Sequence, residues 1–410
     1  MIKERIKDKN NKISINWSQL NAIVTGVSAI DMGSLAIRTR AEAEQFAREY
    51  GFNTRDPAAV QEIARAHREA IEFIDKYFLE EDERELFPIE VREPESFLDL
   101  LVFSSNYLNK SNARQQWSCA VLKVMHGIFH IDHDFKLKYF DTIRGQIFDA
   151  WDRLIEHDGT KHFLTDGRMS LPLHDFQRKR NKGRTSILLK LLQKPSYVAS
   201  DIYDHLGMRL VFNTKTEALF ALKLLYKSHQ ISVTNVKPFR SKNNLLDLSH
   251  AKRVFNRFRP LLERSGDYPL EVFRKMDEEM ELLFETGPHK DNPHSSIHYQ
   301  SIQVTVRKMV RVPNPLYQQM EALKRVAGEM IDGSRGLGDI GYIEKELAFY
   351  FDYEIQLMDR HSYEASISGP ASHDAYKRRQ IQTARRRVLG PRLMRYLQER
   401  RELMPETATR

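Results

Sequence analysis

The chain has 410 residues, of which 41% are hydrophobic and 29% charged, a mixture that excludes a fully disordered protein and predicts two or three domains. No segment reaches the roughly 18 apolar residues that cross a bilayer, and no apolar stretch with a cleavage site follows the basic N-terminus. The absence of such segments predicts a protein without a membrane partner. The single cysteine, Cys119, excludes an internal disulfide and predicts a cytoplasmic protein. The net charge of +8 favours anionic partners without choosing among them.

The first 158 residues predict a helical domain. Asp56 followed by Pro57 combines the capping side chain and the first-turn proline of a helix start. Apolar residues then recur at helical spacing, and a second helical pattern runs from Asn112 to Glu156 with one or two breaks. We therefore expect a helical N-terminal domain over 1–158.

Strand-like alternation mixes with helical patterns over 159–390. The patterns predict strands at residues 207–212, 231–236, 298–307 and 349–358, and helices at 187–192, 216–229 and 316–330. Two helical inserts, one basic (249–262) and one acidic (269–285), interrupt this region. The expected fold is thus α+β, with a mixed sheet flanked by helices, followed by a basic C-terminal helix or tail over 391–410.

The strand predicted at 349–358 has one apolar and one polar face. Large apolar side chains alternate there with a second set of residues, which are Tyr350, Asp352, Glu354, Gln356 and Met358. Because successive side chains of a strand point to opposite faces, the second set shares one face. The strand therefore presents carboxylates on the side opposite the core.

The densest cluster of cations lies at residues 178–190, RKRNKGRTSILLK. Its functional candidates are Arg180, Lys182, Ser186 and Lys190, at the start of a short apolar helix. A helix N-terminus flanked by Arg and Lys offers backbone N–H groups and charge-assisted donors to a polyphosphate. The segment alone fits a solvated basic loop equally well.

Asp204 stands just before the strand that contains Arg209. A carboxylate at a strand edge beside a basic cluster is a candidate Mg²⁺ ligand, because Mg²⁺ takes one or two carboxylates together with substrate phosphates. Taken alone, Asp204 is more typical of a turn residue.

Five short motifs follow one another over residues 165–390. They consist in turn of Arg180, Lys182, Ser186, Ile187 and Lys190; of Asp204, Gly207 and Arg209; of Lys290, Asn292, Ser296 and His298; of Glu354, Ile355 and Gln356; and of Gly369, Ala371, Ser372, His373, Tyr376 and Lys377. In order and internal spacing they resemble the synthetase domain of the RelA/SpoT family, nucleotidyltransferase-like pyrophosphokinases that make the alarmones ppGpp and pppGpp.

The resemblance implies transfer of the β,γ-pyrophosphate of ATP to the 3′-hydroxyl of GDP or GTP, with Mg²⁺ as cofactor. It implies that the ATP phosphates are held by Arg180, Lys182, Ser186 and Lys190, with Arg209 nearby. Asp204 and Glu354 would hold the metal, and Glu354 would also take the proton of the 3′-hydroxyl. The residues implied for the acceptor nucleotide are Lys290, Asn292, His294, His298, Gln356, His373, Tyr376 and Lys377.

The acceptor half departs from the family pattern. Pro293 and His294 replace a Gly-Tyr pair whose tyrosine stacks on guanine, and the arginine usual shortly after Glu-Ile-Gln is absent. An adenine nucleotide and an RNA 3′ end therefore stay open as acceptors, and a catalytically silent nucleotide sensor is the alternative from another class. Retention of Asp204 and Glu354 favours the enzyme, because a pure binder does not need a metal pair.

Three other signals receive structural interpretations. Gly336–Gly341 has Gly-x-Gly-x-x-Gly spacing but follows a predicted helix instead of a strand, so we expect a loop. His126 and His130 have the i, i+4 spacing of metal ligands. The metal ligands of a RelA/SpoT hydrolase domain (a His, a His-Asp pair and a distant Asp) are far apart in sequence, and residues 1–155 do not match those separations. We therefore expect a polar helix face and no hydrolase activity. The basic segment 377–401 has an apolar stripe that predicts packing, with contact to RNA or the ribosome as its alternative. A homo-oligomer also stays open.

Overall fold

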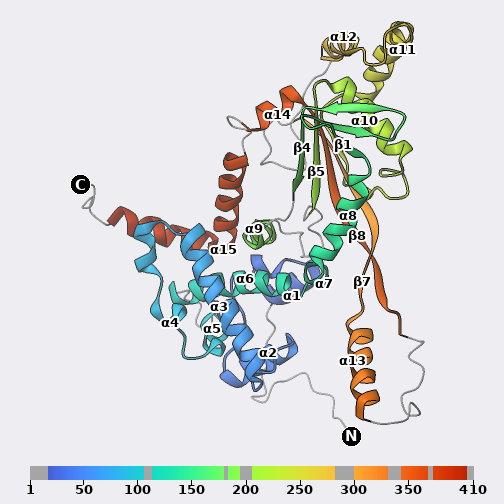
Figure 1. Ribbon diagram of the computed structural model, residues 1–410. Helices are drawn as coiled ribbons and strands as arrows, with labels where there is room; N and C mark the ends of the chain where they lie inside the picture. Colours follow the sequence, from blue (N-terminus) through green and yellow to red (C-terminus); the bar gives the residue numbers. More distant parts are fainter. Residues whose placement is uncertain are drawn as a thin grey trace. The chain divides into compact units, whose positions relative to one another are not determined.

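The computed structural model describes residues 17–105, 113–179, 183–193, 206–281, 300–330, 343–367 and 373–403. The chain is mixed α+β, as predicted (Figure 1), and divides into two compact units. Unit 1 comprises Met1–His133, Arg184–Asp201 and Arg379–Arg410, and unit 2 comprises Asp134–Gly183 and Ile202–Arg378. Each unit thus combines segments that are distant in sequence, whereas the sequence led us to expect the continuous ranges 1–158, 159–390 and 391–410.

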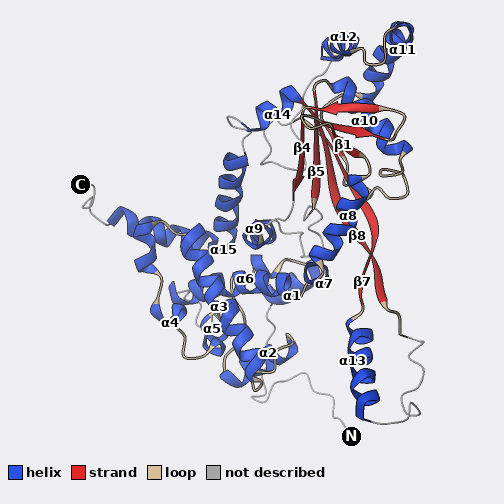
Figure 2. Cartoon of the chain, viewed as in Figure 1, coloured by secondary structure: helices blue, strands red, loops and turns tan. Residues whose placement is uncertain are grey.

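Unit 1 is built from helices (Figure 2). Its α-helices are α1 (Trp17–Thr25), α2 (Arg40–Glu49), α3 (Pro57–Tyr77), α4 (Ile89–Arg92), α5 (Phe97–Phe103), α6 (Ala113–Asp132), α9 (Arg184–Gln193) and most of α15 (His373–Leu403), with short 3₁₀ helices at Ala29–Asp31 and Glu81–Leu86. Asp56 caps α3 by accepting a hydrogen bond from the Ala58 N–H at 3.0 Å, with Pro57 in the first turn, as predicted.

The centre of unit 1 is α6, which contacts α3, α5 and α9. Trp117 of α6 is fully buried, and its ring stacks on Phe87 with centroids 4.3 Å apart. The helix α9 packs where α6 has Gly127, so that a β-carbon at that position would lie 2.7 Å from Leu188 Cδ1. Gly390 adopts a φ of 73° inside α15, a left-handed conformation that suits glycine and interrupts the helix just before Pro391.

Unit 2 contains a five-stranded sheet with strand order β4-β5-β8-β7-β6. Its strands are β4 (Asp175–Lys179), β5 (Gly207–Phe212), β6 (Lys242–Asn243), β7 (Ile302–Pro313) and β8 (Glu346–Asp359). The pair β5–β8 is parallel, and the other neighbouring pairs are antiparallel. A separate antiparallel sheet contains β1 (Ile155–His157), β2 (His162–Thr165) and β3 (Ser170–Leu173).

One face of the five-stranded sheet forms the core of unit 2. Tyr353, Ile355 and Leu357 of β8 are buried there together with Leu210 of β5, which confirms the apolar face predicted for β8. The helices that pack on this face are α8 (Phe140–Asp152) and α10 (Lys215–Lys227). The remaining helices of unit 2 are α7 (Phe135–Lys138), α11 (Leu248–Arg264), α12 (Leu270–Glu281), α13 (Pro315–Met330) and α14 (Arg360–Ile367).

Two predicted strands need correction. Residues 231–236 form a turn, in which the Asn235 N–H donates to the Ser232 carbonyl at 3.2 Å, and only Val236 makes an isolated bridge to the sheet. The strand predicted at 298–307 is described from Ile302 and continues to Pro313, because it pairs along its whole length with β8. The ribbon of β7 and β8 extends beyond the rest of the sheet and has α13 at its tip (Figure 1). None of the described helices has the length and apolar character to cross a membrane.

Candidate active site on the polar face of the five-stranded sheet

The parallel pairing of β5 with β8 aligns two of the predicted motifs. Arg209 is the register partner of Gln356, and Gly207 is the register partner of Glu354. On the other side of β5, Gln177 of β4 pairs with Arg209. Since paired residues point to the same face of a sheet, these side chains share the face opposite the core. Sequence motifs that are 147 residues apart at Arg209 and Gln356 thus become neighbours.

Hydrogen bonds join these side chains across three strands. Arg209 Nε donates to Gln356 Oε1 at 3.1 Å, and Arg209 Nη1 donates to Gln177 Oε1 at 3.2 Å. The amide nitrogen of Gln356, which is buried, donates to a carboxylate oxygen of Glu354. A carboxamide carries both a donor and an acceptor, so Gln356 connects the cation and the carboxylate and fixes the orientation of both.

Glu354 is positioned by the backbone as well. Its N–H donates to the carbonyl of Leu206 at 3.0 Å, beside the end of β5. Its register partner is a glycine, so that no β5 side chain stands next to the half-buried carboxylate. Carboxylate oxygens are ligands that Mg²⁺ takes in proteins, and Glu354 supplies one such carboxylate at this end of β5.

The second carboxylate of the β8 polar face has a different environment. Asp352 is 7% exposed and accepts hydrogen bonds from Lys237 Nζ at 3.0 Å and from Arg307 Nε at 3.2 Å. Two cations thus neutralise its charge and occupy both of its oxygens. Asp352 therefore has a structural role in the sheet, whereas the Glu354 carboxylate is held by the neutral amide of Gln356.

The edge of this face is closed by a tyrosine of α14. The Tyr363 hydroxyl accepts a hydrogen bond from Gln177 Nε2 at 2.6 Å, and Gln177 Nε2 also donates to Asp175 Oδ2 at 2.7 Å. Burial and the Asp175 carboxylate raise the pKa of the Tyr363 hydroxyl, so Tyr363 is uncharged at neutral pH. Beside the Asp352 ion pairs, the polar face therefore presents the Arg209 guanidinium, the Glu354 carboxylate and an uncharged hydroxyl.

The structure places the other predicted residues as follows. Ser186 and Lys190 are half-buried residues of α9 and belong to unit 1, as does Arg184 of the same basic segment. The guanidinium of Arg184 binds Glu69 Oε1 at 2.5 Å and Asp132 Oδ1 at 2.5 Å, so this cation has a structural role. Lys377 is half-buried in the first turns of α15.

Several predicted positions lie outside the described residues or side chains. Those outside the described residues are Arg180, Lys182, Asp204, Lys290, Asn292, Pro293, His294, His298 and the glycine motif Gly336–Gly341. The helix α15 begins at His373 and includes Tyr376, whose backbones are described and whose side chains are not. Within the described residues, no group of three or more His, Cys, Asp or Glu could hold a metal ion.

Sequence reasoning missed Gln177, Tyr363, Lys237 and Arg307. Gln177 had little signal, because the segment Asp175–Lys179 is short for a strand and Phe176 is its one apolar residue. The other three have no local pattern that points to the site.

The chain was also compared with known proteins. Neither protein-family models nor curated proteins give a match. The function is therefore inferred from the chemistry of the site.

Proposed function

We propose that this chain is a Mg²⁺-dependent pyrophosphokinase that transfers the β,γ-pyrophosphate of ATP to the 3′-hydroxyl of a guanine nucleotide, GDP or GTP. The observation that carries the proposal is the connection of Arg209 to Glu354 through Gln356 on two parallel strands. Transfer of a phosphoryl-type group needs a cation near the phosphates and a carboxylate near the attacking hydroxyl, held in fixed geometry.

In the proposed reaction, the acceptor 3′-oxygen attacks the β-phosphorus of ATP. The bond between the β-phosphorus and the oxygen that bridges it to the α-phosphorus breaks, and AMP leaves. Glu354 accepts the proton of the hydroxyl, which is the role of a general base. Arg209, oriented by Gln356 and Gln177, provides positive charge for phosphate oxygens.

The metal would be held by Glu354 and Asp204 and, when bound, would neutralise charge on the phosphates. Arg180, Lys182, Ser186 and Lys190 are the proposed contacts to the ATP phosphates. The motif around His294 and the residues His373, Tyr376 and Lys377 are proposed for the acceptor. All of these roles rest on the motif order in the sequence.

The test is an assay of the purified full chain with γ-labelled ATP and Mg²⁺. GDP, GTP, AMP, ADP and total tRNA are offered separately, and the products are separated by thin-layer chromatography or, for tRNA, on a denaturing gel. We expect label to pass to GDP or GTP with release of AMP. Glu354→Gln should lower the rate of transfer at least about 100-fold, and Arg209→Met at least about 10-fold.

Control variants at exposed positions of unit 2 separate a loss of chemistry from a loss of folding. Glu346→Gln changes an exposed carboxylate at the start of β8, and Arg168→Lys changes an exposed turn cation, so both should keep the wild-type rate. Label transferred to tRNA or to an adenine nucleotide instead would retain the reaction and reject the guanine acceptor. Nucleotide binding without transfer to any acceptor would reject the enzyme in favour of a nucleotide sensor.

A further inference from the structure

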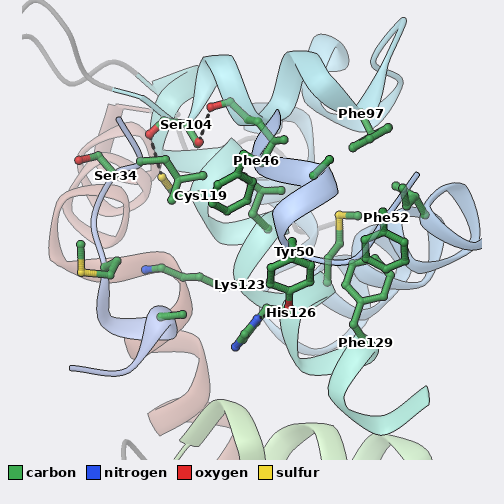
Figure 3. Close-up of a pocket in the computed structure, with 18 residues that line it drawn as sticks. Ser34, Phe46, Tyr50, Phe52, Phe97, Ser104, Cys119, Lys123, His126 and Phe129 are labelled. Atoms are coloured by element: carbon green, nitrogen blue, oxygen red, sulfur yellow. Dashed lines mark hydrogen bonds between the residues drawn. The ribbon is translucent and has the colours of Figure 1, made fainter. Parts of the chain in front are cut away.

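Unit 1 contains a cavity that the proposed reaction does not use. It has a volume of about 170 Å³ and lies among α2, α5, α6 and the segment that follows α1 (Figure 3). Its lining is almost entirely apolar, with aromatic rings from Phe46, Phe52, Phe97 and Phe129. An apolar cavity of this size is poorly suited to water, because water there lacks polar partners, whereas it suits an apolar molecule.

One charged side chain, Lys123 of α6, lines this cavity. Lys123 is 8% exposed, and its Nζ donates to the carbonyl of Val388 at 3.2 Å. No salt bridge among the described residues includes Lys123, and the carboxylate of Asp31, whose charge acts on it, is bound by Arg387 at 2.5 Å and 2.8 Å. A buried ammonium group without a paired anion is unfavourable, so an anionic group in the cavity would stabilise it.

The other polar groups of the cavity are neutral. His126 has its ring nitrogens next to the Tyr50 hydroxyl at 2.6 Å and His130 Nε2 at 3.1 Å. Burial lowers the pKa of His126 to about 4, and burial raises the pKa of the Cys119 thiol to about 11. Burial lowers the pKa of Lys123, and a negative charge beside its Nζ would raise it again, so Lys123 is the group of this cavity that pairs with one negative charge on a ligand.

We propose that this cavity is a binding site for a small monocarboxylate with an aromatic or short aliphatic body, whose carboxylate pairs with Lys123. A 150 Å³ apolar cavity holds benzene, so the body corresponds to about one ring or a six-carbon chain. The proposal is independent of the pyrophosphokinase reaction, and it gives the helices α2, α5 and α6 of unit 1, for which the motifs supplied no role, a ligand-sensing one.

The test follows the methionine methyl groups of the full chain, because Met32 and Met125 line the cavity and Met276 lies in unit 2. The protein is labelled with ¹³C at the methionine methyls, assigned by Met→Leu substitution, and titrated with phenylacetate, 2-phenylethanol and phenethylamine. We expect phenylacetate to shift Met32 and Met125 saturably and Met276 not at all. The neutral alcohol should bind about tenfold more weakly, and the amine should not bind.

Variants assign the effect to the site. Lys123→Met should weaken phenylacetate about tenfold while changing 2-phenylethanol less than threefold, and Lys76→Met, an exposed lysine of α3, should change neither. Ala47→Phe fills the cavity and should abolish all shifts. If this variant does not fold, Lys123→Met alone decides the question. The proposal is overturned if phenylacetate gives no saturable shift, if the alcohol or the amine binds as tightly, or if Lys123→Met leaves phenylacetate binding unchanged.

Discussion

Arg209 and Gln356 lie opposite each other on two parallel strands, with Arg209 Nε donating to Gln356 Oε1 at 3.1 Å. The same amide donates through its nitrogen to the Glu354 carboxylate. The amide oxygen of Gln356 therefore acts as an acceptor and its amide nitrogen as a donor. No carboxylate or hydrocarbon side chain of the same length satisfies both.

Replacement of Gln356 by glutamate is expected to damage the proposed reaction without removing the bond to Arg209. The new carboxylate still accepts from the guanidinium, but it places a second negative charge beside Glu354. A like charge raises the pKa of a carboxyl group, so the acidic limb of the pH–rate profile should move to higher pH, with turnover lowered about tenfold at neutral pH. The measurement is label transfer from ATP between pH 5 and pH 9.

Gln318→Glu makes the same chemical change on the exposed side of α13 and should leave both the rate and the profile as in wild type. An unchanged acidic limb in Gln356→Glu would show that Glu354 does not act as the base.

Asp352→Asn is expected to destabilise unit 2. The carboxylate is buried and accepts from Lys237 and Arg307, so its loss leaves two cations without their anion. Hydrogen bonds to charged groups contribute about 2 kcal/mol each, and partial exposure of Arg307 reduces the total, so the expected loss in the free energy of unfolding is about 2 to 3 kcal/mol. Urea denaturation followed by circular dichroism measures it.

The comparison variant for this loss is Asp141→Asn, which removes an exposed carboxylate paired with Arg144. An exposed pair of this kind contributes about 0.5 kcal/mol or less. Equal destabilisation by the two substitutions would mean that the Asp352 cluster does not stabilise the sheet.

The sequence allowed prediction of β8 and of its polar face, because strict alternation of large apolar and polar residues specifies a strand with one buried face. The same alternation misled at residues 231–236. There the Ser232 N–H donates to Asn235 Oδ1 at 2.7 Å, and Val233 is 91% exposed. Side-chain hydrogen bonds of Ser and Asn favour a turn over a strand, and a pattern of alternating apolar and polar residues carries no information on such bonds.

The partners of the candidate site were beyond prediction for a different reason. Gln177 and Tyr363 are 186 residues apart, and their contact depends on the pairing of β4 with β5 and on the direction in which α14 leaves β8. Strand pairing is a long-range property that local patterns do not encode. Arg209 and Glu354 were found because each lies in its own motif, and their proximity follows only from the register.

The stability of unit 2 should fall as pH rises from about 4 to about 6, through Asp277. Burial, with a smaller contribution from the charge of Asp359, raises the pKa of Asp277 to about 6, although the Lys215 and Thr216 N–H groups donate to its carboxylate at 2.5 Å and 2.9 Å. In the unfolded chain an aspartate has a pKa of about 3.9, so the folded chain binds more protons between these values and loses stability as they dissociate. The loss is about 3 kcal/mol at most.

The quantity to measure is the difference in unfolding free energy between wild type and Asp277→Asn at pH 4, 5, 6 and 7. It should fall with pH and level off above the folded pKa. Asp247→Asn should show the opposite pH dependence, because hydrogen bonds from the His250 and Ser249 N–H groups lower the pKa of Asp247. The stability that the Asp247 carboxylate contributes is therefore lost as pH falls below about 4. A pH-independent difference for Asp277→Asn would contradict the burial of an ionisable carboxylate there.

Gly127→Ala tests the packing of α9, which carries Ser186 and Lys190, against α6. A β-carbon at Gly127 would lie 2.7 Å from Leu188 Cδ1 and 3.7 Å from Leu192 Cδ2, and both leucines are buried. Alanine favours a helix over glycine by about 1 kcal/mol, but overpacking a closed core costs about 1 to 3 kcal/mol. We therefore expect net destabilisation of unit 1 and, if α9 contributes to ATP binding, a weaker affinity for ATP.

The matched substitution is Gly145→Ala in α8, where nothing lies within 4 Å of the new β-carbon. It should stabilise the chain by about 0.5 to 1 kcal/mol and leave ATP affinity unchanged. Thermal denaturation and equilibrium binding of ATP measure both effects. Combining Gly127→Ala with Leu188→Val makes room for the added methyl group, so the double variant should lose less stability than the sum of the two single losses. Strict additivity would show that Gly127 is not required for the approach of α9.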